Sequence, residues 1–195
     1  MEGMKVFENI EDERIGVYLS EQMEEMTADE IGRNVKETLR KCSDDARLKY
    51  CANNVLIGLT GYGIHSLLEE VDKMHLENET ERLNLVGDDK EDLEKVTDEE
   101  LGYVVLYNGV WDERNTFKDV GSYMKYAEER IQNDEEYRIF DEMLQSAAGV
   151  SMKRAAKELG AVKNDLEAKI GSAMGKVELS GPEGKEVPMA GSQTR

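Results

Sequence analysis

Apolar side chains recur every three or four residues through most of the first 150 positions, which is the spacing of amphipathic helices. The repeat is regular in five segments, 11–26, 27–39, 43–59, 115–131 and 134–146. Both prolines lie near the C-terminus, outside these segments, as expected of a helical body. The pattern predicts a mainly α fold with a helical core from about residue 11 to residue 149.

Local sequence marks several helix ends and leaves one segment with two interpretations. Two capping boxes predict helix starts, Thr27 with Glu30 and Thr97 with Glu100. The pair Asn108-Gly109 suits the tight turn of a hairpin, but it also suits the end of a buried helix over 98–107. We favour the helix, because the acidic residues after Thr97 make a strong start signal.

The chain changes character after Gly149. The segments 152–159 and 162–174 have the pattern of two short helices, which predicts a small αα-hairpin over 150–174. The remaining residues, 175–195, contain both prolines and are expected to form a flexible or β-flap tail, short and extended. The sequence thus divides into an acidic helical domain over 1–149, the hairpin and the tail, and it shows no internal repeat.

The charge balance narrows the range of partners. The 195 residues include 43 Asp and Glu against 25 Lys and Arg, which gives a formal net charge of −18. The excess is concentrated in 69–100, with 14 acidic and 4 basic residues. A field of this sign repels nucleic-acid backbones. It suits a divalent cation, a basic partner protein or solubility alone.

Other features of the sequence bear on location. No run of about 18 uncharged apolar residues is present, so no membrane span is expected. The N-terminus is acidic and lacks the basic-then-apolar order of a secretory signal, which predicts a cytoplasmic protein. Cys42 and Cys51 would lie on opposite faces of one helix, so we expect reduced thiols rather than a disulfide.

Two segments carry a resemblance to a known family. Residues 54–61, Asn-Val-Leu-Ile-Gly-Leu-Thr-Gly, resemble the opening of the first core helix of the MazG-like all-α nucleoside triphosphate pyrophosphohydrolases, whose phage members often show Gly-Leu-x-Gly there. Residues 99–107, which begin Glu-Glu-Leu-Gly, are similar to the second core helix of that family. The resemblance covers about residues 45–131. It implies a homo-oligomer that releases pyrophosphate from a nucleotide.

The resemblance also implies a magnesium site. In that family, two helices each present a pair of carboxylates, which hold Mg²⁺ against the triphosphate. This sequence has Tyr62, His65 and Tyr103 where the aligned motifs would have acids. A shifted register offers four other ligands: Glu69, Asp72, Glu99 and Glu100. The resemblance therefore implies either a reduced Mg²⁺ site or a degenerate site that no longer hydrolyses a nucleotide.

Two other functions stay open. The charge of 69–100 favours a non-enzymatic acidic inhibitor or adaptor that binds a basic partner. The segment 152–170 resembles a helix-turn-helix with its turn at Gly160, which would bind DNA. Its second helix carries acidic residues, so nucleic acid is the less expected partner. Trp111 and the tyrosines are too dispersed along the chain to predict a stacking platform.

Overall fold

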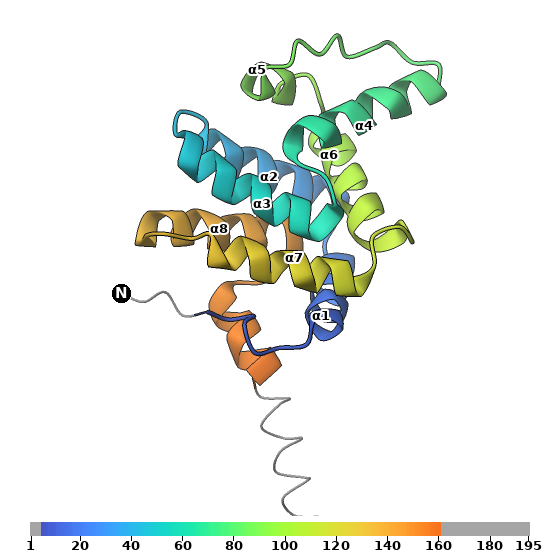
Figure 1. Cartoon of the computed structure of the whole chain (residues 1–195). Helices are drawn as coiled ribbons and strands as arrows, with labels where there is room; N and C mark the ends of the chain where they lie inside the picture. Colours follow the sequence, from blue (N-terminus) through green and yellow to red (C-terminus); the bar gives the residue numbers. More distant parts are fainter. Residues whose placement is uncertain (1–4, 161–195) are drawn as a thin grey trace, which may run out of the picture. The chain divides into compact units, whose positions relative to one another are not determined.

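The computed structural model describes residues 5–160, and this part of the chain is mainly α-helical, which confirms the predicted fold class (Figure 1). The helices are, in chain order, α1 (Asp12–Glu24), α2 (Ala28–Cys42), α3 (Ala46–Thr60), α4 (Ile64–Glu77), α5 (Asp89–Leu93), α6 (Asp98–Leu106), the π-helix η1 (Tyr107–Trp111), α7 (Phe117–Glu129) and α8 (Asp134–Ala148). A further helix begins at residue 152 and reaches the end of the described part. Within residues 5–160, none of the helices is long and apolar enough to span a membrane.

Side chains at the N-caps set most of the helix starts. The residues that accept a backbone N–H in this way are Thr27, Asp45, Asp88, Thr97, Thr116 and Asn133. The capping box predicted at the start of α6 is complete, because Thr97 and Glu100 each accept the backbone N–H of the other. At the end of α3, Gly61 adopts a left-handed conformation with φ of 78°, which stops the helix.

The helix favoured over a hairpin is present as α6, but it does not end at Asn108-Gly109. The chain continues through this pair as the π-helix η1. The buried side chain of Asn108 donates to the carbonyl of Val104 at 2.8 Å, and the N–H of Asp112 donates to the carbonyl of Tyr107 at 2.7 Å. A π-helix takes more residues per turn than an α-helix, so it changes the direction in which the following side chains point.

Two helix pairs cross with their backbones in close contact, α1 with α7 and α2 with α6. The contacts lie at four glycines: Gly16, Gly32, Gly102 and Gly121. A Cβ atom at any of them would overlap a backbone carbonyl of the opposite helix. In the second pair Gly32 meets Asp98 and Gly102 meets Ala28, so α2 and α6 run in opposite directions where they cross.

The four helices that cross begin with one shared local pattern. In each, an aliphatic residue lies four positions after the N-cap and a glycine follows it: Ile15-Gly16, Ile31-Gly32, Leu101-Gly102 and Val120-Gly121. The aliphatic side chain is buried and the glycine admits the crossing helix. The pattern therefore allows α1 and α2 to pack closely against α7 and α6, whose glycines lie about 70 to 105 residues later in the chain.

The helical core extends beyond the boundary expected at residue 149. Gly149 ends α8 with φ of 69°, but Met152, Ala155 and Leu159 are buried in the same core as the earlier helices. The compact unit of the described chain accordingly runs to Leu159. Residue 160, expected as the turn of the hairpin, is still helical. The second hairpin helix over 162–174 and the tail over 175–195 lie outside the described residues.

Candidate functional site

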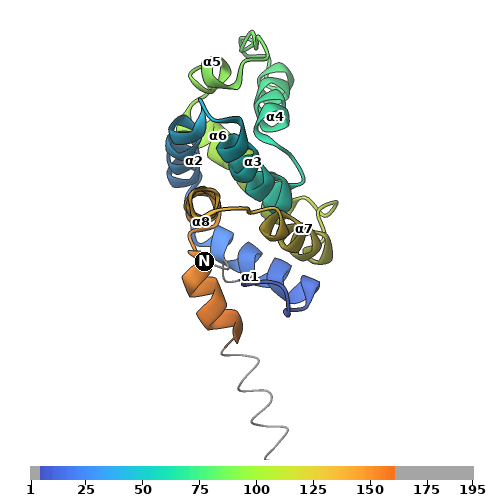
Figure 2. The same ribbon diagram turned by 60° about the vertical axis from the view of Figure 1, so that its left-hand side comes forward.

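The four carboxylates expected to bind magnesium lie on α4 and α6, which contact each other (Figure 2). They do not share one site. Glu69 and Asp72 line a hollow beside Arg82, whereas Glu99 and Glu100 line a separate groove. Across residues 5–160, no group of three or more His, Cys, Asp or Glu side chains is placed to hold a metal ion.

The hydrogen bonds of Asp72 explain why it does not fit a metal site. Its Oδ2 accepts from the guanidinium of Arg82, at 2.9 Å from Nε, and its Oδ1 accepts from the N–H of Leu83 at 2.9 Å. The hydrogen bond and the charge of Arg82 hold the pKa of Asp72 below its ordinary value. Asp72 thus anchors the loop after α4, and both of its oxygens are engaged by protein donors.

Glu100 is engaged in the same way. Its Oε2 accepts from the N–H of Thr97 at 2.9 Å, and its Oε1 lies 2.7 Å from Nε2 of His75 on α4. Nδ1 of His75 lies 2.8 Å from the carbonyl oxygen of Glu81. A carbonyl and a carboxylate only accept, so both ring nitrogens of His75 donate when both hydrogen bonds are made, and the ring is then an imidazolium.

The pKa values of this pair agree with that assignment. The Glu81 carbonyl, and then Glu100, raise the pKa of His75 above its ordinary value. Burial by itself would raise the pKa of Glu100, but hydrogen bonds from Thr97 and His75 outweigh it and lower the pKa. Glu100 therefore ties α4 to α6, and the set of four carboxylates does not fit a hard metal ion that needs free oxygens.

A groove of about 770 Å³ lies between α4 and the continuous α6–η1 segment. The residues that line it include Glu70, Glu77, Glu99, Tyr103, Tyr107 and Arg114. Two of its charges are neutralised at close range, because Glu70 pairs with Lys73 at 2.6 Å and Arg114 pairs with Asp112 at 2.6 Å. Glu77 and Glu99 are exposed and have no ion-pair partner among the described residues. The groove therefore keeps uncompensated negative charge.

Three aromatic side chains form a row on the same segment, which we call the aromatic row: Tyr103, Tyr107 and Trp111. They are 43%, 44% and 51% exposed. The Tyr103 and Tyr107 rings stack with centroids 6.3 Å apart, and the Trp111 ring meets Tyr103 edge-on at 5.9 Å. Eight residues of regular α-helix advance about 12 Å. The π-helix η1 lies between the two residues and turns the Trp111 ring back toward Tyr103.

The aromatic row corrects the expectation that the aromatic residues are too dispersed to form a platform. Tyr103, Tyr107 and Trp111 are each four residues apart, and Glu99 lies four residues before the first of them. Residues four apart share one face of a helix. The spacing in the sequence places Glu99, Tyr103 and Tyr107 on one stripe, and the π-helix brings the Trp111 ring back against Tyr103.

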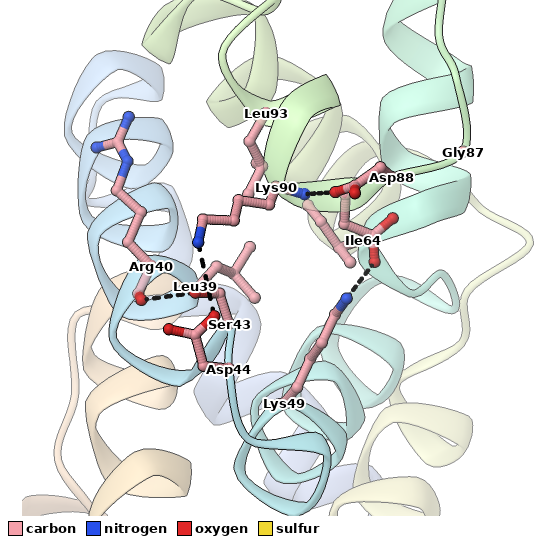
Figure 3. Close-up of a pocket in the computed structure, with 11 residues that line it drawn as sticks. Leu39, Arg40, Ser43, Asp44, Lys49, Ile64, Gly87, Asp88, Lys90 and Leu93 are labelled. Atoms are coloured by element: carbon pink, nitrogen blue, oxygen red, sulfur yellow. Dashed lines mark hydrogen bonds and ion pairs between the residues drawn. The ribbon is translucent and has the colours of Figure 1, made fainter.

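A second hollow lies between the α2–α3 turn, the start of α4, and α5 (Figure 3). Its volume is about 460 Å³. Each of its three long cationic side chains has a carboxylate partner: Lys49 with Asp89 at 3.0 Å, Lys90 with Asp44 at 3.6 Å, and Arg40 with Glu94 at 2.8 Å. These charges neutralise one another and tie α5 to the α2–α3 hairpin, so this hollow is a structural joint rather than a charged binding site.

In comparisons with known proteins, no family model, curated protein or solved structure matches the chain. The geometry of the groove therefore has to support any functional assignment. The MazG-like resemblance stays a prediction from its two sequence segments.

Proposed function

We propose that this protein is a non-enzymatic, acidic helical adaptor or inhibitor, which binds a basic segment of a partner protein in the groove between α4 and α6. The observation that carries the proposal is the exposed aromatic row beside two carboxylates, Glu77 and Glu99, that no described cation neutralises. Tyrosine and tryptophan side chains supply much of the binding energy at many protein interfaces.

The charge distribution supports a basic partner. The segment 69–100, which forms α4, α5 and the start of α6, carries the largest excess of acidic residues in the chain. A surface of one sign attracts an oppositely charged segment over a distance and raises the association rate. The aromatic row would then bury apolar area once the segment is seated, which slows dissociation.

Nucleic acid suits the structure less well than a basic protein does. In the segment expected to act as a helix-turn-helix, Met152, Ala155 and Leu159 are buried in the core of the described chain. Of its exposed cations, Arg154 is paired with Glu158 at 2.8 Å. The groove itself carries negative charge, which opposes a phosphate backbone.

The test is binding of a short labelled peptide of alternating arginine and lysine to the full chain, measured by fluorescence anisotropy at low salt. We expect the double variant Glu77→Gln and Glu99→Gln to weaken binding roughly fivefold to tenfold, since two exposed charge contacts are lost. The matched control is Glu21→Gln with Glu24→Gln, which removes the same charge from exposed positions of α1. Equal weakening by both double variants would show that net charge alone attracts the peptide and would overturn the proposal.

The enzymatic alternative rests on the sequence resemblance alone. The helices that would carry its two motifs are neighbours, but two of the four expected ligands are engaged by protein donors. Magnesium-dependent pyrophosphate release across a panel of nucleotides would support that alternative against the proposal made here. The homo-oligomer that the resemblance implies also stays a prediction, which sedimentation at several protein concentrations would test.

A further inference from the structure

The exposed tyrosine and tryptophan side chains of the described residues form two groups, which differ in whether an arginine of the chain itself covers them. Tyr50 on α3 lies under Arg47, with Cζ 5.2 Å from the ring centroid. Tyr126 on α7 lies under Arg130, with Cζ 4.0 Å from the ring centroid. In the part of the chain that the structure describes, no arginine or lysine covers a ring of the aromatic row.

The aromatic row also has the second partner that a guanidinium needs. Glu99 lies one turn before Tyr103 on the same stripe of α6, is exposed, and has no described ion-pair partner. Tyr103 and Tyr107 present nearly parallel rings, with an angle of 23° between their planes. A planar cation can therefore stack on a ring while its N–H groups reach a carboxylate one turn away.

We infer that the aromatic row binds arginine side chains of the partner segment in preference to lysine side chains. This inference rests on the proposed function, because it names the chemistry of the segment that the groove takes. A guanidinium is planar and weakly hydrated, and it both stacks on an aromatic face and donates to a carboxylate through two N–H groups. A lysine ammonium is a compact, strongly hydrated charge and cannot stack. The same protein already uses arginine on its other exposed tyrosines.

The experiment compares two labelled peptides of equal length and charge, one with arginine and one with lysine at every basic position, by anisotropy with the full chain. We expect the arginine peptide to bind about fivefold more tightly, which is the size of one or two exposed cation–π contacts. The double variant Tyr103→Leu with Tyr107→Leu removes the two near-parallel rings, including the ring one turn from Glu99, and should abolish this preference while weakening the lysine peptide less than the arginine peptide. The control, Tyr126→Leu, changes a ring that already has its own arginine and should leave the preference intact.

The outcomes separate the two claims. Equal binding of the two peptides to the unmodified protein would overturn the arginine inference and leave the proposed function standing. Binding of neither peptide would overturn both. A preference for arginine that persists in the double variant, or that disappears in the Tyr126→Leu control, would show that the aromatic row is not its source. Circular dichroism checks that each variant is folded.

Discussion

Tyr126 and the tyrosines of the aromatic row differ in the residue that lies four positions later in the chain. Tyr126 is followed four residues later by Arg130, which lies over its ring. Tyr103 and Tyr107 are each followed four residues later by another aromatic residue, Tyr107 and Trp111. Because residues four apart share a helix face, the first arrangement caps a ring internally and the second extends a bare aromatic surface. In these helices, the residue four positions after a tyrosine therefore decides whether an arginine of the chain covers the ring or the ring stays free to contact a partner.

The two places also differ in the structure around the rings. The aromatic row belongs to a helix that crosses α2 at Gly32 and Gly102, and it faces a second wall, α4, across the groove. Tyr126 borders an open hollow of about 430 Å³, whose lining residues all come from α7.

The largest effect is expected where α6 is held against α2. Gly102→Ala would place a methyl group on the backbone carbonyl of Ala28, so the two helices must separate. We expect a loss of about 3 kcal/mol in the free energy of unfolding, as for severe overpacking, measured by urea denaturation. Gly160→Ala makes the same chemical change in a helical glycine where an added Cβ meets no atom of the described residues within 4 Å. It should be neutral or stabilise by up to about 1 kcal/mol. Similar losses for both would contradict the close crossing.

The next largest effect is expected when an arginine of the chain itself is placed against the aromatic row. Trp111→Arg replaces the ring that meets Tyr103 with an arginine, so that a guanidinium can lie against the aromatic row as Arg130 lies over Tyr126. We expect the affinity for the arginine peptide to fall more than tenfold, because the variant loses a ring and supplies its own competing cation (~1.4 kcal/mol or more). Trp111→Leu, which removes the ring without adding charge, should give an intermediate loss. If both variants weaken binding equally, internal capping has no effect.

The reverse change is expected to be smaller. Arg130→Ala removes the cation that lies over Tyr126, whose ring is 40% exposed. We expect a second, weak site for the arginine peptide, visible as a stoichiometry above one by calorimetry, with a gain of under 1 kcal/mol. An unchanged stoichiometry would show that a bare tyrosine without the groove beside it binds no arginine.

The smallest effect is expected for the hydrogen bond between His75 on α4 and Glu100 on α6, which holds the two sides of the groove together. The pKa of His75 is raised above its ordinary value of 6.5 by the Glu81 carbonyl and then by Glu100. A raised pKa in the folded state stabilises the protein fully below the unfolded pKa, and the stabilisation is lost as pH rises through the folded pKa. The stability difference between the unmodified protein and His75→Gln should therefore be about 1 kcal/mol near pH 6 and smaller near pH 9. An equal stability difference at both pH values would show that the charge of His75 does not strengthen its hydrogen bonds.

Much of this fold is predictable from local signals. The three-to-four spacing of apolar residues locates the helices, and the Thr97 capping box identifies α6. The glycine crossings are not accessible in this way, because the four glycines gain meaning only once α2 is known to meet α6 and α1 to meet α7. The π-helix likewise depends on backbone contacts around Asn108 that the sequence pattern does not reveal.

The candidate site was only partly predictable. The acidic character of 69–100 and the carboxylates on α4 and α6 are visible in the sequence. The roles of Asp72 and Glu100 are not, because their partners, Arg82 and His75, lie 10 and 25 residues away along the chain. The aromatic row could have been predicted in part, since its members are four residues apart in the sequence. That spacing indicates a shared surface only when the helix is known to continue through Asn108-Gly109.

The most direct test uses Trp111, the single tryptophan of the chain, as a reporter at the end of the aromatic row. The arginine peptide is titrated into the unmodified protein while tryptophan emission and its quenching by acrylamide are recorded. We expect a saturable change in the emission of Trp111 and protection of its ring from acrylamide, with the same midpoint as binding measured by calorimetry. Binding by calorimetry with no change in the emission or quenching of Trp111 would place the peptide elsewhere and contradict the account.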